Sequence, residues 1–246
     1  MLSFVYKYME GKVFCPVICG AFLLGEFMQN QNRTSEYLKK IIGIALFAAL
    51  AYAATFVFRI PVQFLTFDAK DAILTVGAFV FGPIAAVIMP LVPALIELIS
   101  ISDTGPLGFV MNYASSLTFT LTAALIYRFR RSLNGAIISL YVAVGATVIV
   151  MTGMNILITP IYMKVPREVV LNLLPSLLMP FNFAKALMNA AIVMLVYKPV
   201  SVALKRTGIV KGQGSLAFTR GSVIMLIVGA VTLVLAAVVF IVLKTQ

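Results

Sequence analysis

The amino-acid sequence predicts an all-α membrane protein that crosses the bilayer several times. Hydrophobic residues make up 62% of the 246 positions, charged residues make up only 11%, and the mean hydropathy is +1.07. A soluble domain of this size needs far more charged surface. Long apolar stretches recur along the chain, without the alternation of lipid-facing and lumen-facing residues that a transmembrane β-barrel requires.

The N-terminal stretch is apolar but short for a membrane span. Residues 13–28, VFCPVICGAFLLGEFM, contain a proline and a glutamate and lack a small-residue cleavage site. The segment that follows, QNQNRTSEYLKK, is typical of a cytoplasmic N-terminus, so we expect translation to start at Met28 and residues 1–27 to be an upstream extension of the reading frame. Residues 1–35 together are expected to form an N-terminal extension that precedes the bundle. Cys15 and Cys19 make a poor metal site, and we interpret them as small membrane residues.

Six apolar spans over residues 36–206 are expected to form one bundle. The 72–101 stretch is interrupted by Gly82-Pro83, where the proline removes a backbone donor and disfavours helix just before it, so two helices are expected to meet there. Residues 72–81 are too few to cross a bilayer of about 30 Å unless the bundle shields them. The other four spans are expected at about 41–58, 107–127, 136–159 and 171–197.

A basic linker at 207–220 leads to one more apolar run at 221–243, which we interpret as an extra lipid-facing transmembrane helix. The chain carries 19 Lys and Arg against eight Asp and Glu, and most basic residues fall between apolar runs. There they orient helices and meet lipid headgroups, so we do not expect nucleic acid as a partner. Three basic clusters share the cytoplasmic side of one six-span arrangement: 33–40, 128–131 and 198–220.

Ala45, Ala49 and Ala53 recur at intervals of four residues and share one face of the first predicted span. Small residues at this spacing let a second helix approach closely in lipid, where packing drives association. Alanine is also common in membrane helices, as Ala48 and Ala51 illustrate. The pattern by itself therefore leaves both a docking face and a chance arrangement open.

Five polar residues lie within apolar spans at about the same depth, towards the outer face: Glu97, Asn112, Asn155, Asn182 and Lys185. Ionisable groups in this setting are costly and normally face a cavity or each other. Asn182, Lys185 and Asn189 share one helix face, on which we interpret Asn189 as a helix-packing residue. The convergence favours a binding cavity, while a lysine reaching the interface and asparagines bridging helices form the alternative interpretation.

The residue types indicate recognition rather than catalysis. Asparagine offers a donor and an acceptor suited to an amide or imide edge, and lysine donates to a carbonyl or hydroxyl group. The sequence has no histidine, no P-loop, no G-x-S-x-G motif and no clustered carboxylate pair. We therefore expect a protein that is not an enzyme and that has no metal or cofactor site. Any uphill transport must then take its energy from another protein.

Three segments resemble a known family: FLTFDAKDAILTVGAFVFGPIAAVIMPLVPALIELIS, NYASSLTFTLTAALIYR and MPFNFAKALMNAAIVMLVYKPVSVALKR. They are similar to the membrane-embedded S components of energy-coupling factor (ECF) vitamin transporters, and most similar to the riboflavin-binding type. The resemblance covers about residues 36–206. It depends on the Asp-containing first loop, the Gly-Pro break and the P-F-N-x-x-K start of the sixth helix.

The resemblance implies a six-helix bundle in a prokaryotic cell membrane that captures riboflavin from outside, as transported ligand and not as cofactor. It also implies docking, through the alanine face, on a T component that two ATP-binding subunits drive. Family ligand contacts match Asn155, Asn182 and Lys185, and Glu97 and Asn112 join this expected site by their depth. The loop that closes over the ligand matches Phe64, Leu65, Thr66, Phe67 and Asp68.

Two features depart from the family pattern. The 221–243 span follows the point where the family commonly ends, and the first loop continues as Ala69-Lys70-Asp71-Ala72, where a small hydroxyl residue and a proline are expected. Two alternatives stay open beside a riboflavin-binding S component. One is an S component for another vitamin or precursor, and the other is a membrane assembly protein whose polar residues join helices.

Overall fold

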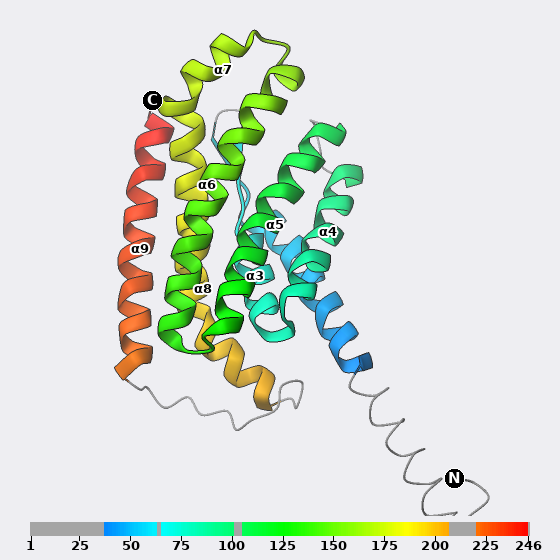
Figure 1. The fold of residues 1–246 in the computed structure, drawn as a ribbon, viewed down its shortest axis with the longest axis vertical. Helices are drawn as coiled ribbons and strands as arrows, with labels where there is room; N and C mark the ends of the chain where they lie inside the picture. Colours follow the sequence, from blue (N-terminus) through cyan, green and yellow to red (C-terminus); the bar gives the residue numbers. More distant parts are fainter. Residues whose placement is uncertain (1–36, 63–64, 101–104, 207–219, 246) are drawn as a thin grey trace, which may run out of the picture. The chain divides into compact units, whose positions relative to one another are not determined.

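The computed structural model describes residues 37–62, 65–100, 105–206 and 220–245, which Figure 1 draws in colour. The extension expected at 1–35 and most of the linker expected at 207–220 lie outside these residues. The chain divides into two compact units, Met1–Ile42 and Gly43–Gln246. In the first unit the described residues are the opening turns of a helix, Tyr37–Val57, and the packing described below belongs to the second unit.

The second unit is a bundle of long helices. After the Tyr37–Val57 helix, the elements are β1 (Ile60–Val62), β2 (Leu65–Phe67), α3 (Lys70–Phe81), α4 (Pro83–Ser100), α5 (Gly105–Phe129), α6 (Leu133–Met163), α7 (Arg167–Leu173), the π-helix η1 (Leu174–Leu178), α8 (Met179–Arg206) and α9 (Arg220–Thr245). Six helices in the described part of the chain are long and apolar enough to cross a membrane. The predicted helical membrane fold, with an extra C-terminal helix, is confirmed.

α3 is the short helix that the Gly-Pro break predicts. Gly82 ends it with a backbone φ of +93°, a conformation that favours glycine, and α4 begins at Pro83. Nine of its 12 residues are buried, and α4, α5 and α8 pack around it. A helix too short to cross the bilayer is thus enclosed by protein, as a short element at membrane depth requires.

Two predicted helix ends were wrong because proline does not stop these helices. α6 continues through Pro160 to Met163, and α8 continues through Pro199 to Arg206, beyond the ends expected at 159 and 197. Membrane helices tolerate proline where neighbouring groups satisfy the freed backbone. α6 ends one turn after its proline, where Lys164 adopts the left-handed conformation.

An antiparallel hairpin of β1 and β2 follows the Tyr37–Val57 helix, and the all-α prediction did not include it. Ile60 pairs with Phe67, and Val62 pairs with Leu65. Two strands of three residues each are too short to give the alternation by which a strand is recognised in a sequence. The chain then passes through Asp68 and Ala69 directly into α3.

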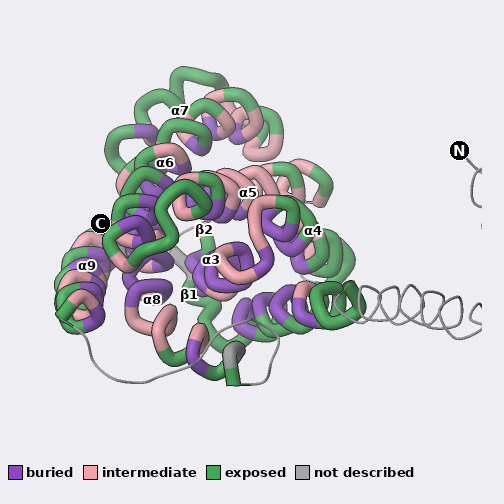
Figure 2. Tube along the Cα trace, turned by 60° about the horizontal axis from the view of Figure 1, so that its bottom comes forward, coloured by how far each residue is buried: buried purple, intermediate pink, exposed green. Residues whose placement is uncertain are grey.

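The extra helix α9 lies along α8 and also contacts α6 (Figure 1). Its exposed residues follow one side and its buried residues the other, as Figure 2 shows. The two helices approach closely at Gly229, where an added Cβ atom would lie 3.0 Å from the Cβ of Met194. The helix expected to face lipid therefore also packs along one face against the bundle.

Candidate ligand-binding site

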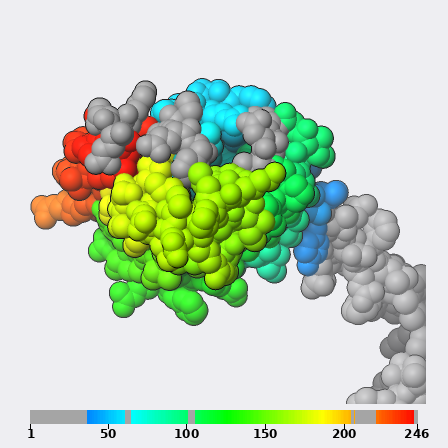
Figure 3. Space-filling model, turned by 90° about the horizontal axis from the view of Figure 1, so that it is seen from above, coloured from blue at the N-terminus to red at the C-terminus, as the bar shows by residue number. Residues whose placement is uncertain are grey.

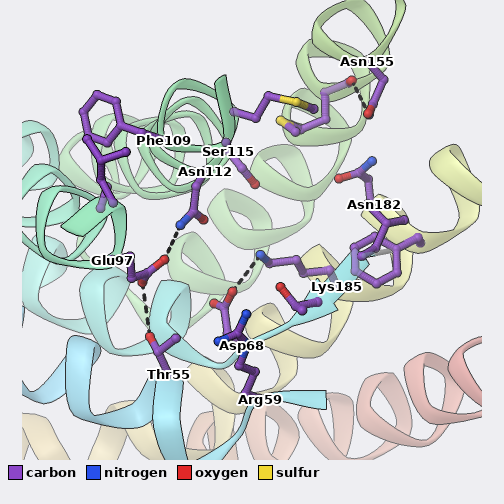
Figure 4. A pocket seen from close by; sticks show the side chains of 18 of the residues that line it. Thr55, Arg59, Asp68, Glu97, Phe109, Asn112, Ser115, Asn155, Asn182 and Lys185 are labelled. Atoms are coloured by element: carbon purple, nitrogen blue, oxygen red, sulfur yellow. Dashed lines mark hydrogen bonds and ion pairs between the residues drawn. The ribbon is translucent and has the colours of Figure 1, made fainter. Parts of the chain in front are cut away.

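A cavity of about 270 Å³ lies within the bundle, beside the hairpin. Its walls come from the Tyr37–Val57 helix, β2, α4, α5, α6 and α8, so residues far apart in sequence meet there. Figure 4 shows Glu97 and Asn112 on one side of the cavity and Asn155 and Asn182 on the other. Lys185 and Asp68 lie between these two groups in the same view.

Asn155 of α6 and Asn182 of α8 are both buried and both line the cavity. The amide nitrogen of Asn155 donates to the carbonyl oxygen of Met151 at 2.7 Å, and its oxygen accepts from the Thr159 hydroxyl at 2.9 Å. The amide nitrogen of Asn182 donates to the Leu178 carbonyl oxygen at 2.8 Å. These local bonds hold the two carboxamides in fixed orientations on one side of the cavity (Figure 4).

Lys185 forms an ion pair with Asp68, with 3.0 Å between Nζ and Oδ2. The pair joins α8 to the chain just after β2, and both side chains line the cavity. Burial raises the pKa of the Asp68 carboxyl, but the ammonium groups of Lys185 and Lys70 outweigh burial and hold that pKa below its ordinary value. The other carboxylate oxygen, Oδ1, is buried without a hydrogen-bond partner among the described residues. Asp68 thus keeps one acceptor available beside the cavity.

A second ion pair closes the α4 side of the site. Lys70, whose side chain is only 1% exposed, donates to both oxygens of Glu97 at 2.7 and 2.8 Å. The Asn112 amide and, at 3.4 Å, the Thr55 hydroxyl also donate to Glu97. The Lys70 ammonium lies 3.9 Å from Asp68 Oδ2, so it links the two ion pairs.

The sequence analysis did not predict Lys70 as a residue near the site. Its position in the loop segment that departs from the family pattern was the one signal that could have identified it. Asp71, the next residue, is also buried and accepts from the Ser116 hydroxyl of α5. Both residues begin a helix that is enclosed by the bundle, so their charges need partners inside the protein. Only the three-dimensional arrangement identifies those partners, since Glu97 and Ser116 lie 27 and 45 residues away.

Asn189 is fully buried and holds the start of α3 against α8. Its side-chain oxygen accepts from the backbone nitrogen of Ala72 at 2.9 Å, and its nitrogen donates to the Asp68 carbonyl oxygen at 3.2 Å. It is not among the residues that line the cavity. This position agrees with the interpretation of Asn189 as a helix-packing residue.

The structure brings together eight of the ten residues predicted for the ligand site. These line the cavity: Leu65, Thr66, Asp68, Glu97, Asn112, Asn155, Asn182 and Lys185. Phe64 lies outside the described residues. Phe67 does not line the cavity, and its ring packs against that of Phe240 instead.

Several cavity residues carried no recognisable signal in the sequence. Thr55 and Ser115 are hydroxyl residues of a kind common in membrane helices, and Phe109 and Phe181 are two of 18 phenylalanines. Arg59 also lines the cavity but is exposed, in the connection before β1. Among the described residues, no group of three Cys, Asp or Glu side chains is placed to hold a metal ion.

The alanines of the Tyr37–Val57 helix fall on two different faces. Ala45, Ala49 and Ala53 are all exposed, whereas Ala48 and Ala51 are buried against the bundle. The four-residue repeat thus forms a surface of small side chains that the bundle does not cover. Helical periodicity turns one set outward and the other inward.

Comparisons with known proteins agree with this architecture. The family model for the ECF transporter substrate-specific component matches residues 39–201. The riboflavin transporter RibU of Staphylococcus aureus is 32% identical over 179 residues, covering 68% of this chain and 93% of that protein. The riboflavin transporter FmnP of Bacillus subtilis is 23% identical over 172 residues, covering 65% of this chain and 90% of that protein.

A solved S component of a bacterial ECF transporter has the same fold. The two structures superpose with a TM-score of 0.59 at 29% sequence identity, covering 69% of this chain and 99% of the other. The family match includes every cavity residue named above and the alanine face, and it ends before α9. The chain is therefore a multi-pass cell-membrane protein that belongs to the family of substrate-specific (S) components of ECF transporters.

Proposed function

We propose that the protein captures riboflavin from the outer side of the membrane as the S component of an ECF transporter. The observation that carries this proposal is the meeting of Asn155, Asn182 and Lys185 around one cavity. Two relatives named as riboflavin transporters support the choice of ligand. The protein acts as a transport subunit and not as an enzyme.

The chemistry of the cavity suits the isoalloxazine ring and the ribityl chain of riboflavin. The two asparagines offer donors and acceptors for the imide-like edge of the ring, and Lys185 offers a donor for a ring carbonyl. Apolar side chains suit the dimethylbenzene end, among them Leu65, Met151 and Phe181. The cavity volume of about 270 Å³ lies just below the range of small-molecule pockets, which begins at about 300 Å³.

The charges around the cavity favour an uncharged ligand. Asp68 pairs with Lys185, and Glu97 pairs with Lys70, so each carboxylate already has a cationic partner. A ligand with a net charge at this depth would be buried without compensation, which is costly. Riboflavin has no net charge at neutral pH.

Delivery needs partners, because the sequence contains no nucleotide-binding motif. We propose that the exposed face of Ala45, Ala49 and Ala53 docks on a T component, which two ATP-binding subunits drive. Small side chains at this spacing suit close helix approach in lipid. In this arrangement residues 36–206 form the binding domain, and 207–220 connects it on the cytoplasmic side to α9.

The visible spectrum of the purified full-length protein tests the proposal most directly. We expect a yellow protein that retains flavin, or a flavin-free protein that quenches riboflavin fluorescence at one-to-one stoichiometry. The matched control is Arg131→Ala, which removes an exposed cation from the connection before α6. Binding of another vitamin in place of riboflavin would identify that vitamin as the ligand of this site. No binding of any vitamin would favour an assembly role.

A further inference from the structure

The helix α9 has no counterpart in the part of the chain that the family defines. The family model ends at residue 201, and the solved S component is matched over 99% of its own length by 69% of this chain. α9 begins at Arg220, beyond this family domain. Its contacts with the bundle therefore belong to this protein and not to the common fold.

The two ends of α9 contact different parts of the bundle. Near its beginning, Met225 packs into the main core shared by α3, α5, α6 and α8. Near its end, Phe240 and Leu243 pack in a separate apolar cluster with Phe67, Leu177 and Phe181. Figure 3 views the molecule from the end at which α7 and the C-terminal part of α9 lie.

The apolar cluster of Phe67, Leu177, Phe181, Phe240 and Leu243 adjoins the cavity wall at two places. Phe67 directly precedes Asp68, the partner of Lys185, and its ring meets that of Phe240 edge-on with 5.7 Å between centroids. Phe181 lines the cavity itself and directly precedes Asn182. The end of α9 thus supports both the hairpin and the start of α8, which carry polar residues of the site.

The hairpin requires such support. Its strands have three residues each, and an isolated two-stranded hairpin is at best marginally stable in water. The buried residue of β2 is Phe67, whereas Leu65 is half-buried and Thr66 is exposed. Phe67 belongs to the cluster that contains Phe240, and Leu65 packs against the same cluster and against that of Val170, Leu174 and Leu178. The α9 residue Phe240 supplies the aromatic partner of Phe67.

We propose that the C-terminal end of α9 is a positioning element that holds the β1–β2 hairpin over the cavity and slows ligand release. Phe240 is the principal positioning residue, and it acts through Phe67 on Asp68 without touching the ligand. This inference rests on the proposed function for the identity of the ligand, riboflavin. The attachment of the hairpin itself does not depend on which ligand binds.

Two measurements on the full-length protein test the proposal, comparing Phe240→Ala with Met225→Ala. Both variants remove a large buried side chain from α9, but only Phe240 lies in the apolar cluster that contains the hairpin residue Phe67. In Phe240→Ala, we expect amide hydrogen exchange at residues 65–68 to accelerate without ligand. Riboflavin release, followed by recovery of flavin fluorescence, should become about 3- to 10-fold faster, as loss of an aromatic pair implies. Met225→Ala should change neither quantity. Phe240→Leu keeps an apolar side chain but loses the ring, so it should fall between the wild type and Phe240→Ala in both.

Each result decides one question. Equal acceleration of exchange in Met225→Ala and Phe240→Ala would mean that α9 only stabilises the bundle, which overturns the proposal. Unchanged exchange at 65–68 in Phe240→Ala also overturns it. If Phe240→Ala does not fold, Leu243→Ala in the same cluster takes its place with the same expectation. If the wild-type protein does not bind flavin, the proposed function fails, while the exchange measurement still decides the role of α9.

Discussion

Four charged side chains around the cavity occur as two matched pairs, which accounts for their tolerance inside the bundle. Lys185 pairs with Asp68, and Lys70 pairs with Glu97, while Asn112 and Thr55 add hydrogen bonds to the second pair. Lys185 does not extend to an interface, since its side chain is 11% exposed and directed to Asp68. The local role of each residue therefore follows from its partner as much as from its own type.

Removing single polar groups from the cavity tests their contact with the ligand. We expect Lys185→Ala and Asn155→Ala each to weaken riboflavin binding by about 1–3 kcal/mol, because a buried hydrogen-bonding partner of the ligand is lost. Titration by fluorescence quenching measures the change, and Arg131→Ala, at an exposed site, should bind like the wild type. Wild-type affinity in both cavity variants would remove these residues from the binding site.

The Lys70–Glu97 pair is expected to govern stability more than ligand choice. Lys70→Met leaves the Glu97 carboxylate without its cationic partner, so the free energy of unfolding should fall by about 3 kcal/mol. The double variant Lys70→Met/Glu97→Gln removes both charges and should recover a large part of this loss. Thermal unfolding in one detergent compares four proteins: the wild type, Lys70→Met, Glu97→Gln and the double variant. Additive losses in the double variant would contradict coupling between the two residues.

Residues of the site were predictable from sequence where polarity interrupts an apolar run. Asn155, Asn182 and Lys185 were found in this way, because such residues are costly in lipid and normally face a cavity. Lys70 was not found, since it lies in a connection where charge is ordinary. Phe67 was assigned to the cavity together with the rest of the loop that matches the family, and the sequence does not show that its ring packs against Phe240.

At the scale of elements, α3 depends on its neighbours more than on its own sequence. It has 12 residues, no side-chain hydrogen bond at its N-cap residue Ala69, and a first turn that enters a buried environment. Asn189 of α8 supplies the missing acceptor for the Ala72 backbone nitrogen. The Gly-Pro break at its other end was predictable, because both residue types have strong backbone preferences. The partner from α8 was not, since it lies 117 residues away.

Asn189 and Asn182 lie two turns apart on α8, and their substitutions should have different effects. Asn189→Ala removes the acceptor at the start of α3, so the free energy of unfolding should fall by about 0.5–2 kcal/mol, as for loss of a helix cap. Riboflavin affinity should change less, because Asn189 is not part of the cavity wall. Asn182→Ala should instead weaken riboflavin binding more than it lowers the free energy of unfolding, because Asn182 lines the cavity. Paired measurements of unfolding and binding check both, and equal effects in the two variants would contradict this division.

At the scale of the whole molecule, the chain combines the part that the family model matches with one additional helix, α9. The long apolar runs, the break between α3 and α4, and α9 were all predictable, since each depends on hydropathy or on proline and glycine. The hairpin and the continuation of α6 and α8 past their prolines were not, because tertiary packing decides both. The cavity is likewise a property of the bundle, since six elements contribute to its wall.

The exposed alanine face gives the prediction that separates ligand capture from transport. Ala49→Leu enlarges a side chain that points away from the bundle, so riboflavin binding by the purified protein should stay at the wild-type level. Close approach of a second helix would be blocked, so riboflavin uptake by cells that express the full transporter should fall several-fold. The matched control is Ala230→Leu, the same change at an exposed position of α9. It should leave both binding and uptake unchanged. Full uptake in Ala49→Leu would place the docking surface elsewhere, whereas equal losses in both variants would indicate a general effect of bulky residues on the lipid-exposed surface.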